Sequence, residues 1–177
     1  MALPVDLMEA KKHLQLDSDA FGADYEVAGM IEDAAAWVET YTGHILEARD
    51  VTETLSGFER MELRAWPIMP STVVGIAYTD STGAPIGIAA ARLDVSSRPA
   101  RVLPPFGSRW PIVPKGTIVT ATFRAGYEKV DDVPRDFRRA MLILIAGYDS
   151  DREGGDLAAK SEATAARLCG RHRLRRL

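Results

Sequence analysis

Histidine and cysteine are the side chains of this chain that could hold a metal ion or act as a nucleophile. The histidines, His13, His44 and His172, lie in three different predicted elements, and none has a Cys, Asp or Glu neighbour at metal-ligand spacing. His13 and His44 are therefore interpreted as surface or packing residues. Cys169 lies among arginines, which could lower the pKa of its thiol and make it reactive, but a tolerated free thiol is the simpler interpretation. We predict no metal site and no cofactor.

Acidic pairs and glycine-rich stretches are the other features that could carry chemistry. Asp131 and Asp132 precede a predicted helix, where helix capping explains them, and the acids between residues 149 and 153 fit a solvated helix end. The glycines of residues 83–87 lie between predicted strands, and those at 154–155 lack the Lys-Ser/Thr that completes a P-loop. We therefore predict that the protein is not an enzyme.

Three tryptophans lie where a subunit interface could use them. Trp66 and Trp110 each precede a proline at the edge of a predicted strand or loop, and Trp37 lies at the margin of a helical apolar stripe. Such tryptophans usually close a core, but Trp is also favoured among the residues that anchor protein interfaces. Both interpretations stay open.

The charge of the chain is divided unequally. The whole chain has 22 basic and 25 acidic side chains, a net charge of −3. Its last eleven residues hold five arginines and no acid, which leaves 17 basic and 25 acidic side chains, a net charge of −8, in residues 1–166. A basic arm of this kind favours an acidic protein surface or a phosphate backbone. Its arginines are Arg167, Arg171, Arg173, Arg175 and Arg176.

Composition predicts a soluble protein with one ordinary domain. Apolar residues make up 46% and charged residues 27% of the chain, and no apolar run approaches the roughly 20 residues that span a bilayer. The first residues lack the basic start and apolar core of a signal peptide, which predicts a protein made and used in a cytoplasm. One cysteine cannot form an internal disulfide, which agrees with that location.

Apolar periodicity predicts helices over about residues 5–16, 24–42 and 134–150. Asp6 is expected to cap the first, and Gly43 to end the second in a left-handed conformation. Asp132 is expected to cap the third, with Pro134 in its first turn. An alanine-rich stretch, residues 157–168, has good helix propensity but little bulk to bury, so we expect this last helix to lie outside the core.

A β module is predicted between these helices, over about residues 50–127. Residues 117–124 alternate apolar and polar side chains, as a half-buried strand requires, and residues 73–79 form another predicted strand. Residues 52–55 and 61–64 suit a hairpin, and residues 86–90, 92–95 and 101–103 suit further strands. We thus expect one domain over residues 1–153, followed by an alanine-rich helix and basic arm over residues 154–177.

The order of these segments is similar to that of a known family. A helix ending Glu-Thr-Tyr-Thr-Gly (residues 39–43) is followed by a Pro-x-x-Pro lead (67–70) and a strand (73–78) with its Asp-Ser-Thr-Gly turn. A second strand ending Ala-Gly-Tyr (125–127) precedes the helix that follows Val133-Pro134. Over about residues 4–153 the chain resembles the head–tail connector proteins, also called adaptor or head-completion proteins, of long-tailed bacteriophages and gene transfer agents.

This resemblance implies an α+β fold, with an α-helical bundle, an inserted antiparallel β-sheet module and a C-terminal arm. It implies a ring of subunits, twelvefold in this family, that joins the capsid portal to the stopper or tail. The partners would be the portal protein, the stopper or tail terminator, further copies of the chain and the DNA in the channel, with no membrane. The location would be the head–tail joint of the virion, assembled in the bacterial cytoplasm.

The arginine-rich arm has no clear counterpart in the family pattern, so its role is inferred from charge. Its arginines could pair with acidic side chains of the portal or face DNA in the channel. An alternative function is a nucleic-acid-binding regulator that grips DNA with this arm, although the chain shows no helix-turn-helix signature. A small hydrolase is a third alternative, which rests only on scattered polar residues.

Overall fold

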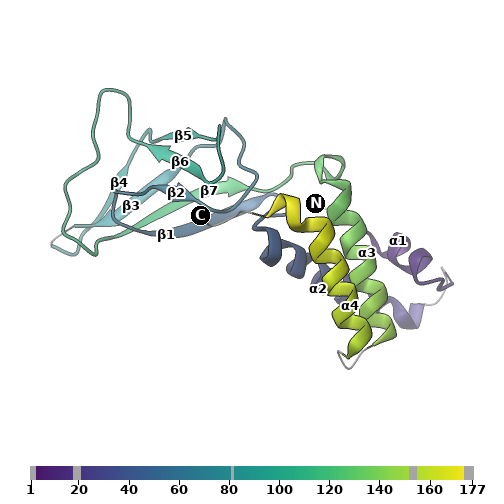
Figure 1. Ribbon diagram of the computed structural model, residues 1–177. Coiled ribbons are helices and arrows are strands. Elements are labelled where there is room, and N and C mark those ends of the chain that lie inside the picture. The colour runs from purple at the N-terminus through teal and green to yellow at the C-terminus, as the bar shows by residue number, and fades with distance from the viewer. Residues whose placement is uncertain (1–2, 18–20, 81, 152–154, 174–177) are drawn as a thin grey trace. The chain divides into compact units, whose positions relative to one another are not determined.

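The computed structural model describes residues 3–17, 21–80, 82–151 and 155–173. The chain forms two compact units, each described here by itself. The helical unit comprises Met1–Glu47 and Tyr127–Leu177, and the β unit comprises Ala48–Gly126. Figure 1 shows the helices and strands of each unit with their labels. The β unit is therefore an insertion between two halves of a helical fold, which confirms the predicted α+β class.

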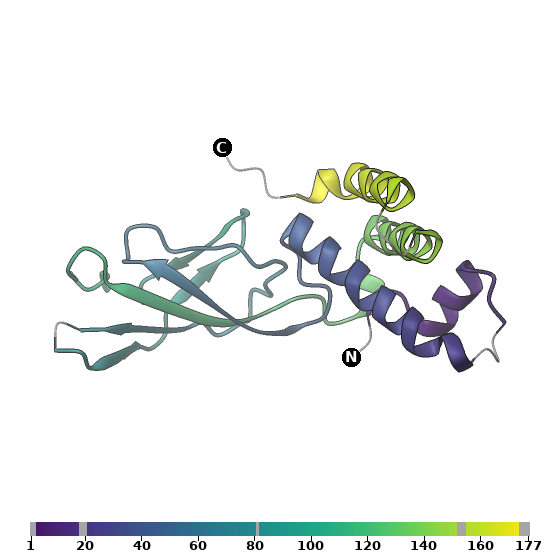
Figure 2. The same cartoon turned by 90° about the horizontal axis from the view of Figure 1, so that it is seen from below.

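The helical unit contains four α-helices and three short 3-10 helices among the described residues. The first half of the unit contains α1 (Leu7–His13), η1 (Phe21–Ala23) and α2 (Asp24–Thr42). The second half contains η2 (Val130–Asp132), α3 (Arg135–Ser150), α4 (Asp156–Cys169) and η3 (Gly170–His172). Both views show α3 and α4 side by side as a helical hairpin (Figures 1 and 2).

The ends of the first two helices form as their sequences predict. The side chain of Asp6 accepts a hydrogen bond of 2.7 Å from the backbone N–H of Glu9 and so caps α1. Gly43 ends α2 with φ 70°, and its N–H donates to the carbonyl of Glu39. Glycine reaches this left-handed conformation without the cost that a Cβ would add.

The start of α3 differs from the prediction. Pro134 is the N-cap residue of α3, with no capping side chain, and Arg135 is the first helical residue. Asp132 belongs to η2, where its own N–H donates to the carbonyl of Lys129. The predicted cap by Asp132 is therefore wrong, because Asp132 ends the short 3-10 helix and lies two residues before the N-cap position.

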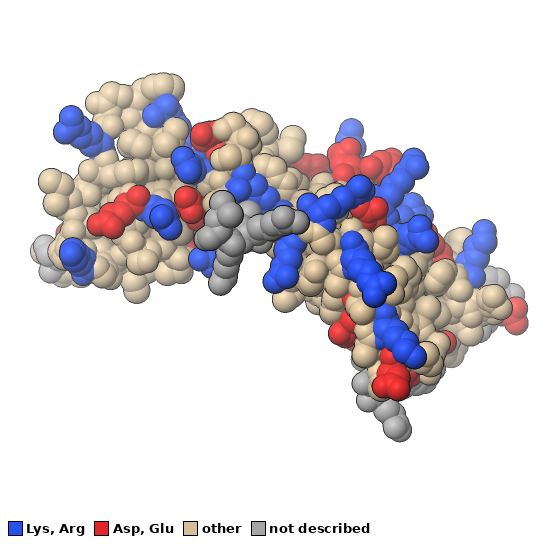
Figure 3. All heavy atoms as spheres, in the orientation of Figure 1, with Lys and Arg blue, Asp and Glu red and all other residues tan. Residues whose placement is uncertain are grey.

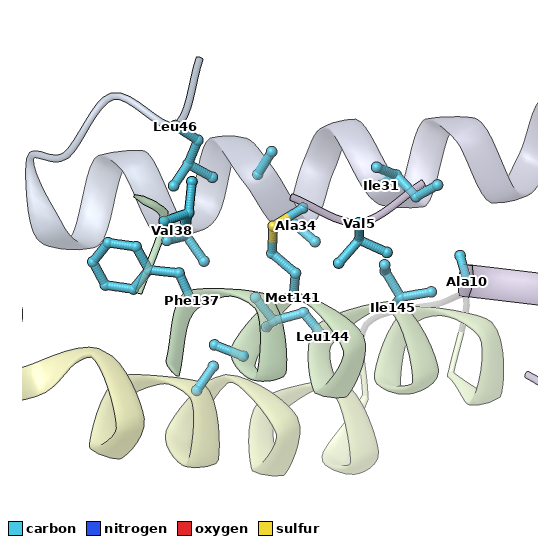
Figure 4. Packing of buried hydrophobic residues seen from close by; sticks show 14 of the residues in the cluster. Val5, Ala10, Ile31, Ala34, Val38, Leu46, Phe137, Met141, Leu144 and Ile145 are labelled. Carbon is cyan, nitrogen blue, oxygen red and sulfur yellow. The ribbon is translucent and has the colours of Figure 1, made fainter. Parts of the chain in front are cut away.

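A continuous apolar core joins the helices. Figure 4 shows side chains of α2, such as Ala34 and Val38, facing Phe137 and Met141 of α3. Ile145 lies near Val5 and Ile31 in the same view. Because Phe137, Met141, Leu144 and Ile145 are fully buried, α3 is the central element of this core.

The alanine-rich helix belongs to this core, contrary to prediction. Ala165 and Cys169 of α4 have no exposed surface, and both are members of the core cluster. The reason is the close approach of α3 and α4, which Gly147 allows. A Cβ on Gly147 would lie 2.4 Å from Oγ of Ser161. Small residues thus let two helix backbones approach, so little bulk is needed to fill the space between them.

The β unit consists of two antiparallel sheets. One sheet has the order β1–β7–β3–β4, with β1 (Arg49–Ser56), β7 (Ile118–Ala125), β3 (Gly75–Thr79) and β4 (Pro85–Ile88). The other has the order β2–β6–β5, with β2 (Glu62–Leu63), β6 (Ala100–Leu103) and β5 (Arg92–Asp94). In β7, Val119, Ala121 and Phe123 are buried in alternation with more exposed residues, as predicted.

The predicted hairpin between residues 52–55 and 61–64 does not form. Strand β1 instead pairs with β7 over eight residue pairs, from Arg49↔Ala125 to Ser56↔Ile118. Strand β2 pairs with β6 in the other sheet. The first and last strands of the insertion therefore pair with each other. This ladder is far longer than a hairpin of β1 with β2 could be, because β2 has only two residues.

Candidate functional site

The five arginines assigned to the C-terminal arm have different structural settings. Arg167 is an exposed residue within α4, so it belongs to a helix and not to an arm. Arg171 and Arg173 lie at and just after η3. Arg175 and Arg176 lie outside the described residues. In the sequence the five arginines form one group, because no acidic residue lies between them. In the structure α4 extends past the first of them, Arg167.

Asp136 of α3 holds the segment that follows α4. Its Oδ2 forms an ion pair with Arg171 and lies 3.0 Å from Nε2 of His172. Burial raises the pKa of Asp136, but the hydrogen bonds from His172 and Arg171 outweigh burial and bring this pKa below its ordinary value. The guanidinium of Arg173 lies 4.9 Å from the ring centroid of Tyr41 in α2, a cation–π contact. Residues 171–173 are thus attached to both α2 and α3.

An aromatic cluster of His44, Tyr127, Phe137 and His172 lies next to Asp136. His44 is buried, and its Nδ1 lies 2.8 Å from the hydroxyl of Tyr127. The ring of Phe137 meets His44 and His172 edge-on, with centroids 5.0 Å and 4.8 Å away. His44 is therefore a packing residue. Sequence reasoning missed its contact with His172, because only the return of α4 along α3 brings residue 172 to this place.

Replacing Asp136 with Asn is expected to destabilise the helical unit by about 1 kcal/mol at neutral pH, because hydrogen bonds to a charged, partly exposed carboxylate are lost. The folded pKa of Asp136 is lowered, so its contribution is complete above the ordinary Asp pKa of about 3.9 and is lost as pH falls through the folded pKa. The measurement is the difference in melting temperature between wild type and Asp136→Asn from pH 7 to pH 3. The exposed Asp17→Asn is the control. A difference that stays constant over this range would contradict the assignment.

Cys169 is not an activated thiol. Burial, followed by the negative charge of Asp136, raises the pKa of Cys169 to about 12. The side chain has no exposed surface. The idea that neighbouring arginines activate this cysteine is therefore wrong, since the thiol faces the core of the helical unit while the arginines do not.

The three tryptophans are all partly buried. Trp37 stacks on Tyr41 with centroids 4.9 Å apart, and Trp110 stacks on Phe58 at 5.0 Å. Their role as anchors of a subunit interface stays a prediction. The large apolar side chains that the described β unit does expose are different ones, namely Met69, Val73, Ile86, Phe106, Ile112 and Ile118.

Two of these exposed residues lie in the proline-rich stretch between β6 and β7. Phe106 is 85% exposed, and Ile112 is fully exposed. The guanidinium of Arg92 lies 4.0 Å from the ring centroid of Phe106. The sequence alone does not distinguish these two residues, because an apolar residue among prolines gives no periodic signal. They are candidate contact residues for another protein.

Metal-binding groups are not found in the described part of the chain. Among those residues, no set of three or more His, Cys, Asp or Glu side chains is placed to hold an ion. No helix in the same residues is long and apolar enough to span a membrane.

The chain is similar to chains of solved structures. No protein-family model and no curated protein matches the chain. A chain in the neck of an empty gene transfer agent particle, computed with C6 symmetry, is 25% identical with a TM-score of 0.76. Chains in the virion of the native particle and in its neck, computed with C12 symmetry, are 25% and 24% identical with TM-scores of 0.75 and 0.70. Each match covers 100% of this chain and 94% of the other. The protein thus has, over its whole length, the fold of a chain from gene transfer agent particles.

Proposed function

We propose that this protein is a structural component of the neck of a gene transfer agent or phage-like particle. In this proposal it forms a ring, twelvefold as in the connector family, that joins the capsid portal to the stopper or tail and extends the DNA channel. It acts at the head–tail joint of the virion and catalyses no reaction.

The observation that carries this proposal is the similarity of fold along the whole chain to a neck chain, with a TM-score of 0.76. Both units contribute to it, because the match covers 100% of this chain. Agreement over a helical fold with an inserted β unit is more specific than agreement over either part alone. The order of sequence motifs, from the Tyr-Thr-Gly end of α2 to the Val-Pro before α3, supports the same family independently.

The test is electron microscopy of particles from cells that lack the gene. Filled or leaking heads beside unattached tails are expected, because the joint between them would be missing. Reintroduction of the wild-type gene should restore joined particles. Normal particles, or an absence of heads, would contradict a role at the joint.

The arm is proposed to contact the portal or the DNA through its terminal arginines. Arg171 and Arg173 already contact Asp136 and Tyr41, so Arg175 and Arg176 are the better positions for a test. We expect Arg175→Gln with Arg176→Gln to reduce the fraction of heads that retain the protein, most strongly at low salt, where charge interactions are least screened. Lys115→Gln, which removes an exposed charge from the β unit, is the control. Equal retention at all salt concentrations would mean that the charge of the arm is incidental.

A further inference from the structure

Helix α4 has a basic side. Lys160 and Arg167 are seven residues apart, which places them on one side of the helix. We call these two residues the basic stripe. Figure 3 shows Lys and Arg side chains along α4 on the face in view. Lys160 and Arg167 are exposed and make no ion pair among the described residues. At about 100° per residue, Glu162 lies roughly 140° around the helix from Arg167.

The other side of α4 borders a groove within the helical unit. The groove has a volume of about 380 Å³. Asp33 and Glu162 line it and make no ion pair among the residues described. We call it the acidic groove, and its lining comes from α2, from the end of α3 and from α4: Met30, Asp33, Tyr148, Asp151, Ala158, Ala159 and Glu162.

The groove combines an apolar surface with negative charge. Met30 and Tyr148 supply the apolar part. Burial raises the pKa of Tyr148, and the negative charges of Glu162 and Asp33 raise it further. Such a lining suits a long basic side chain, because its methylene stem can contact the apolar residues while its head meets the carboxylates.

Helix stability explains only part of this charge arrangement. Asp151 accepts a hydrogen bond of 3.1 Å from the N–H of Leu157 and so satisfies the start of α4. Interaction with the helix dipole accounts for Asp156 in the first turn of α4 and for Arg167 in its last turn. It does not account for Lys160 and Glu162, which lie in the middle of α4, or for Asp33, which lies on another helix. The basic and acidic side chains are therefore separated onto two sides of the helical unit. The helix dipole does not require this separation.

We propose that the basic stripe of one copy of this chain docks against the acidic groove of the next copy. In this contact Lys160 and Arg167 pair with Asp33 and Glu162. A second copy is the occupant because the complementary charges lie on one chain but on opposite sides of α4, where they cannot meet within that chain. A contact between two different patches is heterologous, and it generates a ring if the rotation closes. The inference rests on the proposed function, since it assigns the subunit contact of the proposed ring.

The geometry of this contact can be tested by cross-linking. Ala159 lines the acidic groove, and Thr164 is an exposed residue between Lys160 and Arg167. The full chain with Ala159→Cys and Thr164→Cys, which keeps all four charges, is treated with a short bismaleimide, both as purified protein and within particles. A ladder of dimers, trimers and larger species is expected, because each copy then reacts on two sides. Each variant with a single introduced cysteine should give only traces of dimer. These single variants also show whether Cys169, which is buried, takes part in the reaction. Particles that contain the doubly substituted chain but give no ladder would overturn the proposal.

The chemistry of the contact can be tested by charge reversal. One variant carries Lys160→Glu with Arg167→Glu, and the other carries Asp33→Lys with Glu162→Lys. We expect each alone to reduce incorporation into particles about tenfold or more. Expressed together they should restore it, since each reversed side then meets an opposite charge on the other variant. The control, Arg60→Glu with Arg109→Glu, makes the same charge change at exposed positions of the β unit.

The outcomes separate this inference from the proposed function. If the wild-type chain and both charge-reversed variants are incorporated into particles equally well, the inference is overturned and the proposed function stands. Loss by each variant without recovery in the mixture would also overturn it, because the defect would then not be one of charge pairing. If even the wild-type chain is absent from particles, the proposed function fails, and the ladder from the purified chain decides the inference.

Discussion

Phe137→Ala is expected to lower the free energy of unfolding of the helical unit by about 3–5 kcal/mol, the range for removal of a fully buried Phe side chain. Phe137 has no exposed surface and lies between α2 and α3 (Figure 4). Its ring also meets His44 and His172 edge-on, so the substitution removes the aromatic contacts that hold η3 against α3. Hydrogen exchange of the amides in α2, α3 and η3 would measure the loss.

The matched control for this substitution is Phe106→Ala in the β unit. Phe106 is 85% exposed, and its ring lies against the guanidinium of Arg92. The expected change is within about 1 kcal/mol, the scale of an exposed cation–π contact. Because a typical domain is stable by only about 5–15 kcal/mol, the two variants should be clearly distinguishable. Equal losses would mean that the core is not centred on Phe137.

Gly147→Ala is expected to destabilise the contact between α3 and α4, although alanine is the better helix former. The new Cβ would lie 2.4 Å from Oγ and 2.6 Å from Cβ of Ser161, so one helix must move. Overpacking of this kind costs about 1–3 kcal/mol, which exceeds the gain of about 1 kcal/mol in helix propensity. Faster hydrogen exchange in α4 is the expected result.

Two further variants test the reason for this effect. Gly29 lies in α2, and no atom outside its own helix turn lies within 4 Å of the position that a Cβ would take there. Gly29→Ala should therefore stabilise the unit by about 0.5–1 kcal/mol. Ser161→Gly removes both clashing atoms and should make Gly147→Ala tolerable in the double variant. If Gly147→Ala stabilises as much as Gly29→Ala does, the close packing of α3 on α4 is refuted.

Local sequence patterns were sufficient to predict most of the elements. The apolar steps of α2 and the glycine after it locate this helix, because both its periodicity and its left-handed end are properties of neighbouring residues. The alternation of buried side chains in β7 is likewise visible in eight consecutive residues. The α+β class follows from such patterns, since each depends on contacts that recur every two to four residues.

The pairing of strands and the role of α4 depend on contacts between distant segments. Nothing within residues 49–56 indicates that β1 pairs with β7, about seventy residues later, because a strand can satisfy its hydrogen bonds with any partner of matching length and pattern. The alanine-rich helix packs into the core because Gly147 on another helix lets it approach closely, and the alanines alone do not indicate this partner.

The candidate functional surfaces show the same division. The order of residues was enough to establish that the chain ends in a run of arginines and that its tryptophans border predicted strands, loops and a helix. Folding placed Arg167 within α4, separated it from Arg171 and Arg173, and brought Asp33, Glu162 and Tyr148 from three helices to one groove. The physical reason is that a run of charge depends only on residues that are neighbours in the sequence. A binding surface depends instead on which sides of different helices come together at one place on the surface.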